Sequence, residues 1–357
     1  MGIFKRWRKA RKARKAKRTR ADIQKALTKA YENPRTQTRE VQPTDRIIVF
    51  SDLHKGARDG ADDFQRCERA YNAALAYYFH LGYHLIELGD VEELWENSFE
   101  EVATKYPRTL ELAADFHDEG RYTRFWGNHD LAWKDTRLFQ QRMSQYGYRD
   151  VEPIEALKLT VPYDGGTRRG ELFLVHGHQG TADSDRYAFF SRLFVRYAWR
   201  NIQRRLNRPW NTPSVDWALR GEHARTMEEW ALGQWDRGNR TVLIAGHTHL
   251  PVFYESKKKP GVTPADTAAP DGDPEALRLA WAEWDTAEVE RLRHQRPYKL
   301  KAPCYFNSGC CAFGDGDITG IEIAGGRIAL VHWTSDAPTH PNEYAGLPVK
   351  DVFEFRR

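Results

Sequence analysis

The chain has 357 residues, which fits either one large α/β unit or two to three domains of ordinary size. Its mean hydropathy of −0.74, with no apolar run of about 18 residues, excludes a protein that spans a membrane with helices. Its four cysteines are too few for a disulfide-rich scaffold and show no Cys-x-x-Cys spacing, which favours a reducing compartment.

Positive charge is concentrated in residues 1–20, which we call the basic leader. It holds 11 of the 55 Lys and Arg residues and no acidic one, so the rest of the chain has 44 basic against 50 acidic groups. With Phe4 and Trp7 near its start, the leader is typical of a segment that binds an anionic membrane surface. Non-specific binding of nucleic acid is a less favoured alternative, and plain solvation is a third.

The leader also bears on localisation. It lacks the apolar core of a secretory signal, so we expect no cleavage and no export. The sequence therefore predicts a cytoplasmic protein, and the cations add the hypothesis of peripheral attachment to the inner face of the membrane.

The folded part is expected to begin with strands and helices in alternation. Apolar runs predict strands at 47–50, 84–88 and 122–126, and helical patterns predict helices at 64–81 and 106–119. This order implies a parallel sheet with right-handed crossovers. Further strands are predicted at 156–161, 171–175, 241–245, 251–254, 305–307, 318–323 and 328–333, the last four as an antiparallel set.

Composition divides the chain into three parts. Residues 1–44 form a basic N-terminal appendage, 45–335 a domain and 336–357 a C-terminal tail. Within the domain we expect a mostly helical, cap-like insertion at 181–240 and a charged insertion at 255–299.

Metal-type ligands follow five of the predicted strands. The clusters are Asp52 and His54, then Asp90, then Asn128 and His129, then His176 and His178, and finally His247 and His249. In open α/β sheets, ligands bind beyond the carboxyl ends of the strands, so we expect one common site. Residues i and i+2 of an extended backbone point the same way, so Asp52 with His54, and His247 with His249, would each present both side chains to that site.

The residue types indicate which ions the site would take. Two Asp, one Asn and four His suit two divalent ions of intermediate character rather than Ca²⁺. We favour Mn²⁺, with Fe²⁺, Zn²⁺ and Co²⁺ as alternatives. With two carboxylates, such a pair of ions keeps a net positive charge and would suit a phosphate anion.

The motifs SDLH, GDVEELW, GNHD, HGH and GHTH, in this order, resemble those of the calcineurin-like metallophosphoesterase superfamily. The resemblance covers roughly residues 47–333 and implies an α/β fold: a two-sheet β-sandwich flanked by helices, here with a helical insertion. The motifs are most similar to the UDP-2,3-diacylglucosamine pyrophosphohydrolase branch, which also has an acidic residue and a Trp after the Gly-Asp. His178 stands where that branch usually has Asp, and His129 stands where its members often have Arg.

The resemblance also implies roles for individual residues. Asp52, His54 and His249 would hold one metal, and Asn128, His176 and His247 would hold the other. Asp90 would bridge the two.

Three further side chains would act on the substrate or on its neighbours. His129 would face the phosphate as a general acid or oxyanion donor, and Glu93 stands where family members place the carboxylate that orients this His. The alternative for Glu93 is a carboxylate that stabilises a helix start. His178 would either contact the substrate or support the residues that do.

The implied reaction is hydrolysis of a phosphodiester or pyrophosphate bond by in-line attack of a metal-bridging hydroxide. The substrate would be a phosphorylated small molecule, a nucleotide or a lipid-linked compound. Arg192, Arg196 and Arg200 recur every four residues, so on a helix they would share one face. They would clamp the substrate, dock on anionic lipid, or stay solvated. The alternative functions are a nuclease or cyclic-nucleotide phosphodiesterase and a non-catalytic metal-binding scaffold. The sequence does not indicate an oligomeric state.

Overall fold

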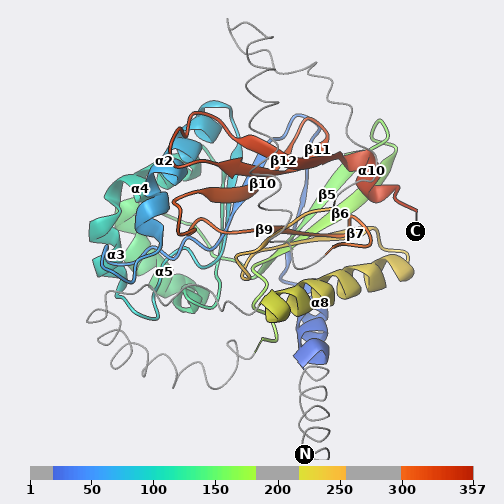
Figure 1. Ribbon diagram of the computed structural model, residues 1–357, viewed down its shortest axis with the longest axis horizontal. Helices are drawn as coiled ribbons and strands as arrows, with labels where there is room; N and C mark the ends of the chain where they lie inside the picture. Colours follow the sequence, from blue (N-terminus) through green and yellow to red (C-terminus); the bar gives the residue numbers. More distant parts are fainter. Residues whose placement is uncertain (1–18, 182–216, 255–298, 357) are drawn as a thin grey trace, which may run out of the picture.

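The computed structural model describes residues 19–181, 217–254 and 299–356, and two six-stranded sheets form its centre (Figure 1). Sheet A has the strand order β1 (Gln37–Glu40), β5 (Ala156–Tyr163), β6 (Arg168–Val175), β7 (Thr241–Ala245), β9 (Tyr305–Ser308) and β8 (Pro251–Val252). Sheet B has the order β12 (Asn342–Pro348), β11 (Arg327–Trp333), β10 (Ile318–Ala324), β2 (Ile47–Phe50), β3 (His84–Leu88) and β4 (Tyr122–Phe125). The predicted α/β class with two sheets is confirmed.

Each sheet contains a run of three parallel strands. In sheet B these are β2, β3 and β4, and in sheet A they are β6, β7 and β9. Of the four late strands expected to be antiparallel, β8 pairs with β9 and β10 with β11 in that way. However, β9 also runs parallel to β7. The predicted ligands therefore follow strands whose carboxyl ends share a direction within each sheet.

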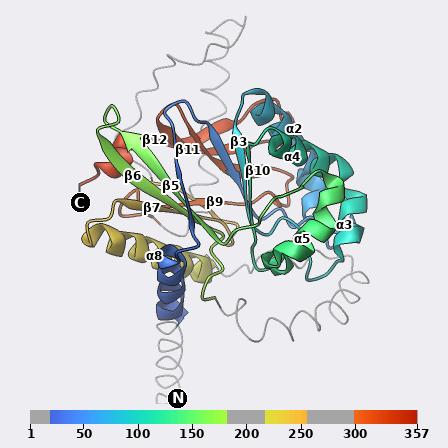
Figure 2. The same ribbon diagram turned by 180° about the vertical axis from the view of Figure 1, so that it is seen from behind.

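Helices cover the outer face of each sheet (Figures 1 and 2). Sheet B is covered by α2 (Phe64–His80), α3 (Phe99–Lys105), α4 (Pro107–Asp118) and α5 (Thr136–Met143), with short 3₁₀ helices η1 (Leu131–Lys134) and η2 (Ser144–Tyr146). Sheet A is covered by α8 (Trp217–Asp236) and by a helix over residues 19–32. A short helix, α10 (Val349–Phe353), follows β12. Within the described residues, every helix is too short or too polar to serve as a membrane span.

The side chains of β2 show how the core is divided. All four are fully buried. Ile47 and Val49 belong to the apolar cluster shared with sheet A, whereas Ile48 and Phe50 belong to the cluster formed with the outer helices. A strand buried on both faces reads as a continuous apolar run, which is why the sequence signal at this strand is clear.

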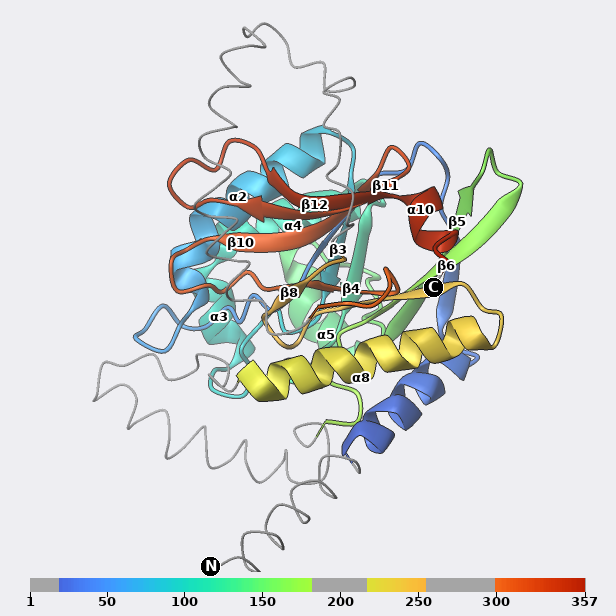
Figure 3. The same cartoon turned by 45° about the vertical axis from the view of Figure 1, so that its right-hand side comes forward.

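The N-terminal segment packs against sheet A. In the helix over 19–32, Ile23 and Leu27 are buried in the core. The indole N–H of Trp230 on α8 donates to Thr28 Oγ1 at 3.0 Å. Figure 3 shows this helix beside α8, and β1 pairs in parallel with β5. Part of the expected appendage, residues 19–44, therefore adds a helix and a strand to the sheet A layers.

The C-terminal segment similarly extends sheet B. Residues expected as a tail form β12, which pairs with β11, and α10, whose Phe353 is buried. The division into appendage, domain and tail stays a prediction. Residues 1–18 of the basic leader, and most of both predicted insertions (182–216 and 255–298), lie outside the described residues.

Candidate active site

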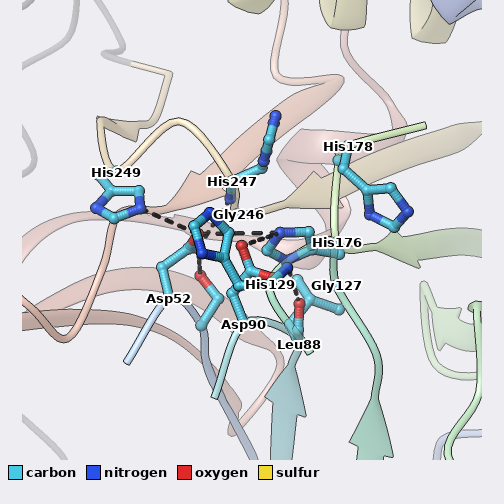
Figure 4. Close-up of polar contacts among 12 residues, drawn as sticks. Asp52, Leu88, Asp90, Gly127, His129, His176, His178, Gly246, His247 and His249 are labelled. Atoms are coloured by element: carbon cyan, nitrogen blue, oxygen red, sulfur yellow. Dashed lines mark hydrogen bonds and ion pairs between the residues drawn. The ribbon is translucent and has the colours of Figure 1, made fainter. Parts of the chain in front are cut away.

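The predicted ligands meet where the loops after β2, β3, β4, β6 and β7 lie side by side. Figure 4 shows Asp52, Asp90, His129 and His176 at the centre, with His249 and His178 on opposite sides. Three groups have ligand atoms within 4.8 Å of one another: Asp52, His54 and His249; Asp90, His176 and His247; and His54, Glu93 and His129. The first group has the three residues predicted for one metal, and the second has Asp90 with His176 and His247, two of the three residues predicted for the other metal.

The backbone of these loops differs from our expectation. Of the eight described non-glycine residues with a positive φ, five are predicted ligands: Asp52 (54°), His54 (51°), Asp90 (53°), His247 (68°) and His249 (54°). Left-handed backbone is unfavourable for such residues and gathers at functional sites, where surrounding structure holds it. The extended geometry that we assumed for the two i, i+2 pairs is therefore wrong, although both members of each pair do face the site.

In the first group, Asp52 uses its two oxygens differently. Oδ2 accepts from the Ser51 hydroxyl at 2.5 Å and from the His247 backbone N–H at 2.8 Å. Oδ1 is buried without a hydrogen bond from any described residue, and it lies 3.4 Å from His249 Nε2. His54 Nδ1–H donates to a Glu93 oxygen at 3.0 Å, and His54 Nε2 lies 3.1 Å from His249 Nε2.

In the second group, a ring nitrogen of His176 faces a carboxylate oxygen of Asp90. His176 Nδ1–H donates to the Leu88 carbonyl at 2.8 Å, so Nε2 is the ring nitrogen that would bind a metal once it has lost its proton. That Nε2 lies 3.0 Å from Asp90 Oδ2. Nearby, Asn128 Oδ1 is buried and, among the residues described, has no hydrogen-bond partner. A cation bound between His176 Nε2 and Asp90 Oδ2 would take the place of a proton there, and it could also be bound by Asn128 Oδ1.

The residues present fit a divalent cation in each group. Two ligand atoms that are each about 2.1 Å from one cation lie about 3–3.5 Å apart, as the facing atoms of both groups do. Gly127 and Gly246 allow the close approach, since a Cβ would lie 2.2 Å from Asp90 Oδ1 at Gly127 and 2.5 Å from Asp52 Oδ2 at Gly246. Imidazole, carboxylate and amide donors together suit metals of intermediate character.

Charge in the metal-free site is balanced by protons. Burial lowers the pKa of His176, but the carboxylates of Asp90 and Asp52 raise it more, to about 9. Burial raises the pKa of Asp90, but neighbouring imidazoles, first His176 and then His129, bring it well below its usual range. A cation that binds here must therefore displace protons.

Glu93 connects His129 to His54. Its Oε2 accepts from Nδ1–H of His129 at 2.5 Å and of His54 at 3.0 Å. Burial raises the pKa of Glu93, but the two imidazoles lower it to about 2. No helix begins at Glu93: α3 starts at Phe99, after a capping box formed by Ser98 with Glu101. The helix-start alternative is therefore wrong, and the position of Glu93 fits the orienting role, which stays a prediction.

His178 lies beside the second group rather than inside it. It is 4% exposed, and its ring centroid is 5.4 Å from those of both His176 and Trp126. Burial lowers its pKa to about 3, so the ring is neutral near pH 7. Its role stays a prediction. The three arginines predicted to bind substrate, at positions 192, 196 and 200, lie outside the described residues.

Sequence reasoning missed His223, which reaches the site from α8. Its Nε2–H donates to the Gly177 carbonyl at 3.1 Å, and its ring centroid lies 5.7 Å from that of His247. His223 follows no strand and belongs to no short motif, so the sequence carried no signal for it.

A buried ionic network under the site was also missed. The guanidinium of Arg124 lies 2.9 Å from Glu87, 2.5 Å from Glu92 and 2.9 Å from Asp130. Asp130 Oδ1 in turn accepts the backbone N–H of Gly127 at 2.6 Å, so the network holds the loop that carries Asn128 and His129. A charged residue inside the apolar run 122–126 was the available signal.

Comparison with known proteins agrees with this geometry. The family model described as calcineurin-like phosphoesterase matches residues 45–251, which is more than half of the chain. The chain belongs to the calcineurin-like phosphoesterase family. The matched segment contains all seven predicted metal ligands, and family membership with these clustered ligands indicates a metal-dependent phosphoester hydrolase.

Solved structures give more distant similarities. One is the crystal structure of a conserved uncharacterised protein, a predicted phosphoesterase, from Streptococcus pneumoniae TIGR4: 12% identity, TM-score 0.29, covering 85% of this chain and 98% of the other. Another is Vacuolar Protein Sorting 29 from Cryptosporidium parvum: 14% identity, TM-score 0.31, covering 85% and 97%. No curated protein matches the chain.

Proposed function

We propose that the protein is a dinuclear metal-dependent phosphoesterase that hydrolyses a phosphodiester or pyrophosphate bond. The position of Asp90 carries the proposal. Its Oδ2 lies 3.0 Å from His176 Nε2 in one ligand group and 3.9 Å from His54 Nε2 in the other. A carboxylate oxygen between two sets of imidazole nitrogens supports a pair of ions that share Asp90, for which Mn²⁺ is our first choice.

The roles of the residues follow from this arrangement. Two bound divalent cations would lower the pKa of a shared water and neutralise charge on the phosphate oxygens. His129 keeps 23% of its side chain exposed, and Glu93 holds its Nδ1. Its Nε2 therefore remains available to donate a proton to the departing oxygen. Burial lowers the pKa of His129, but Glu93 and then Asp90 raise it above the ordinary value, which favours the protonated ring.

The substrate class rests on two sequence features. The motif order is most similar to UDP-2,3-diacylglucosamine pyrophosphohydrolases, and the basic leader suits an anionic surface. We therefore propose a lipid-linked or nucleotide pyrophosphate at the cytoplasmic face of a membrane. The same cations support a nuclease as the second candidate. A scaffold is disfavoured because none of the seven predicted ligands is missing.

A substrate panel tests the activity. Purified protein with Mn²⁺ would be given a model diester, UDP-2,3-diacylglucosamine and single-stranded DNA. We expect turnover with Mn²⁺ and its loss in Asp90→Ala and His247→Ala, with circular dichroism unchanged. Full activity in either variant, with metal-free protein equally active, would reject the site.

The membrane proposal has its own test. Deleting residues 1–18 removes most of the cations and leaves the described part of the chain intact. We expect the full chain to sediment with anionic vesicles but not with neutral ones, and the shortened chain to stay in the supernatant. Equal partitioning of both chains would remove the membrane from the proposal.

A further inference from the structure

Trp95, in the loop between β3 and α3, contacts three residues of the candidate site. Its indole stacks on the ring of His129, with centroids 4.0 Å apart and planes at 18°. Its ring N–H donates to the Asn128 carbonyl at 2.7 Å. Its backbone N–H donates to Glu93 Oε1 at 3.2 Å. The sequence shows this Trp in the GDVEELW motif, but none of the roles assigned above uses it.

The stacking contact restricts the ring of His129. Glu93 holds His129 at Nδ1, but one hydrogen bond leaves the ring free to turn about that direction. Trp95 covers one face, and His54 packs against the ring at a centroid distance of 4.5 Å and 85°. These two contacts limit how far the ring can turn about that hydrogen bond, and they therefore set the direction in which Nε2 points.

The indole hydrogen bond acts on a different group. By holding the Asn128 carbonyl, Trp95 fixes the peptide unit next to the side chain whose Oδ1 is predicted to bind metal. Groups that orient a metal ligand typically change metal affinity by about 10–100-fold when removed.

We propose that Trp95 is a positioning residue with two separable actions. Its ring sets the orientation of His129 for proton donation to the leaving oxygen, and its N–H sets the orientation of Asn128 for metal binding. The proposal rests on the proposed function, since it takes His129 as the proton donor and Asn128 as a ligand.

Two substitutions separate these actions. Trp95→Phe keeps an aromatic ring over His129 but has no N–H, whereas Trp95→Leu has neither. Both variants should therefore lose Mn²⁺ affinity at one of two sites by about tenfold, to the same extent, in titration calorimetry. Only Trp95→Leu should lose proton donation.

The leaving group reports proton donation. An alkyl leaving group needs a proton, while p-nitrophenolate leaves without one. At saturating Mn²⁺, Trp95→Leu should lower kcat about 10–100-fold for a diester with an alkyl leaving group, with little change for the p-nitrophenyl diester and KM within about twofold. Trp95→Phe should have the same ratio of kcat for the alkyl diester to kcat for the p-nitrophenyl diester, which we call the leaving-group ratio, as the wild type.

Controls distinguish a failure of this inference from a failure of the proposed function. Trp235 donates its ring N–H to the Thr241 carbonyl at 2.7 Å, away from the site, so Trp235→Phe and Trp235→Leu report the general effect of losing an indole. In a His129→Gln background, Trp95→Leu should have no further effect on the leaving-group ratio. A wild type without any hydrolysis would reject the proposed function, and a fully active His129→Gln enzyme would reject His129 as its proton donor. In both cases the calorimetry would still test the action on Asn128.

Three results would overturn the role of Trp95. One is an equal loss of kcat for both leaving groups in Trp95→Leu. Another is a rise in KM alone, which would make Trp95 a substrate contact. The third is unchanged Mn²⁺ affinity in both variants, which would remove the action on Asn128.

Discussion

Replacing Arg124 by Met removes the cation shared by three buried carboxylates beneath the site. Arg124 is 1% exposed, and its guanidinium contacts Glu87, Glu92 and Asp130 at 2.5–2.9 Å. The second cation is Lys55, whose Nζ lies 3.1 Å from Glu92 Oε1. With all groups ionised, two cations and three carboxylates give −1, and the substitution makes this −2 in a region without solvent.

The magnitude follows from this burial. Removing one partner of a buried ion pair costs about 3–5 kcal/mol, because the remaining charge stays desolvated. This is a large part of the roughly 5–15 kcal/mol by which folded domains are stable. Met keeps much of the apolar stem, so the loss is mainly electrostatic.

The unfolding free energy that Arg124→Met loses should also depend on pH. Burial raises the pKa of Asp130 to about 6, even though Arg124 lowers it, and without Arg124 it should rise further. A carboxyl whose folded pKa is above its unfolded value regains stability as the pH falls, because the folded state takes up the proton first. The difference between wild type and Arg124→Met should therefore shrink between pH 7.5 and 5.5.

Urea unfolding, followed by circular dichroism at both pH values, measures the difference in unfolding free energy between the wild type and Arg124→Met. Arg124→Lys keeps the charge but not the forked geometry, so it should lose less than Arg124→Met. Arg108 pairs with Glu111 at 65% and 62% side-chain exposure, and Arg108→Met should cost less than about 1 kcal/mol. The reasoning is refuted if Arg124→Met loses no more than Arg108→Met, or if its loss grows at the lower pH.

Three further predictions concern the space beside Gly127, the protons released when metal binds, and the pH dependence of stability. Gly127→Ala should weaken Mn²⁺ binding about 10–100-fold, because the new Cβ would displace Asp90. Gly233→Ala, with no atom within 4 Å of its Cβ, should bind normally, and equal affinities in calorimetry would contradict the prediction. Mn²⁺ affinity should rise with pH towards about 9, the pKa of His176 without metal. Calorimetry in buffers of different ionisation enthalpy should detect the released protons, and the absence of release would count against His176 as a ligand. For His84, burial and nearby arginines lower the pKa to about 3, so below pH 6.5 the unfolded chain takes up a proton that the folded chain does not. Between pH 6.5 and 5, the unfolding free energy should fall by about 1.6 kcal/mol more in the wild type than in His84→Gln, and parallel pH profiles would disprove this.

Strands in the centre of the sheets were predictable, whereas two polar strands at the edges, β1 and β12, were not. β2, β3 and β7 have the predicted bounds and are buried throughout, so each reads as an apolar run. The residues of β1, Gln37–Glu40, are polar and mostly exposed, and β12 is only partly buried. Polar residues are usual at sheet edges, but they give no apolar signal, so both segments were placed outside the domain.

The residues of the candidate site were likewise predictable only in part. Its predicted ligands were visible because they directly follow apolar strands. The roles of Arg124 and His223 were not predicted, since what a charge within a strand or a His within a helix does is recognisable only once its partners are known. The left-handed backbone of the ligand residues was also out of reach, because Asp and His do not signal positive φ as glycine does.

The two acidic ligands explain how such backbone is held. Asp52 binds the backbone N–H of His247 through Oδ2, and its Oδ1 faces the first ligand group. Asp90 binds the backbone N–H of His129 through Oδ1 at 2.8 Å, and its Oδ2 faces His176. Each carboxylate therefore uses one oxygen to tie its own loop to a neighbouring loop, and its other oxygen faces the imidazole nitrogens of a candidate metal site. Because the loop ties involve only atoms of the protein, the geometry of the site exists before any ion binds. A bound ion then only has to replace protons, not to assemble the loops.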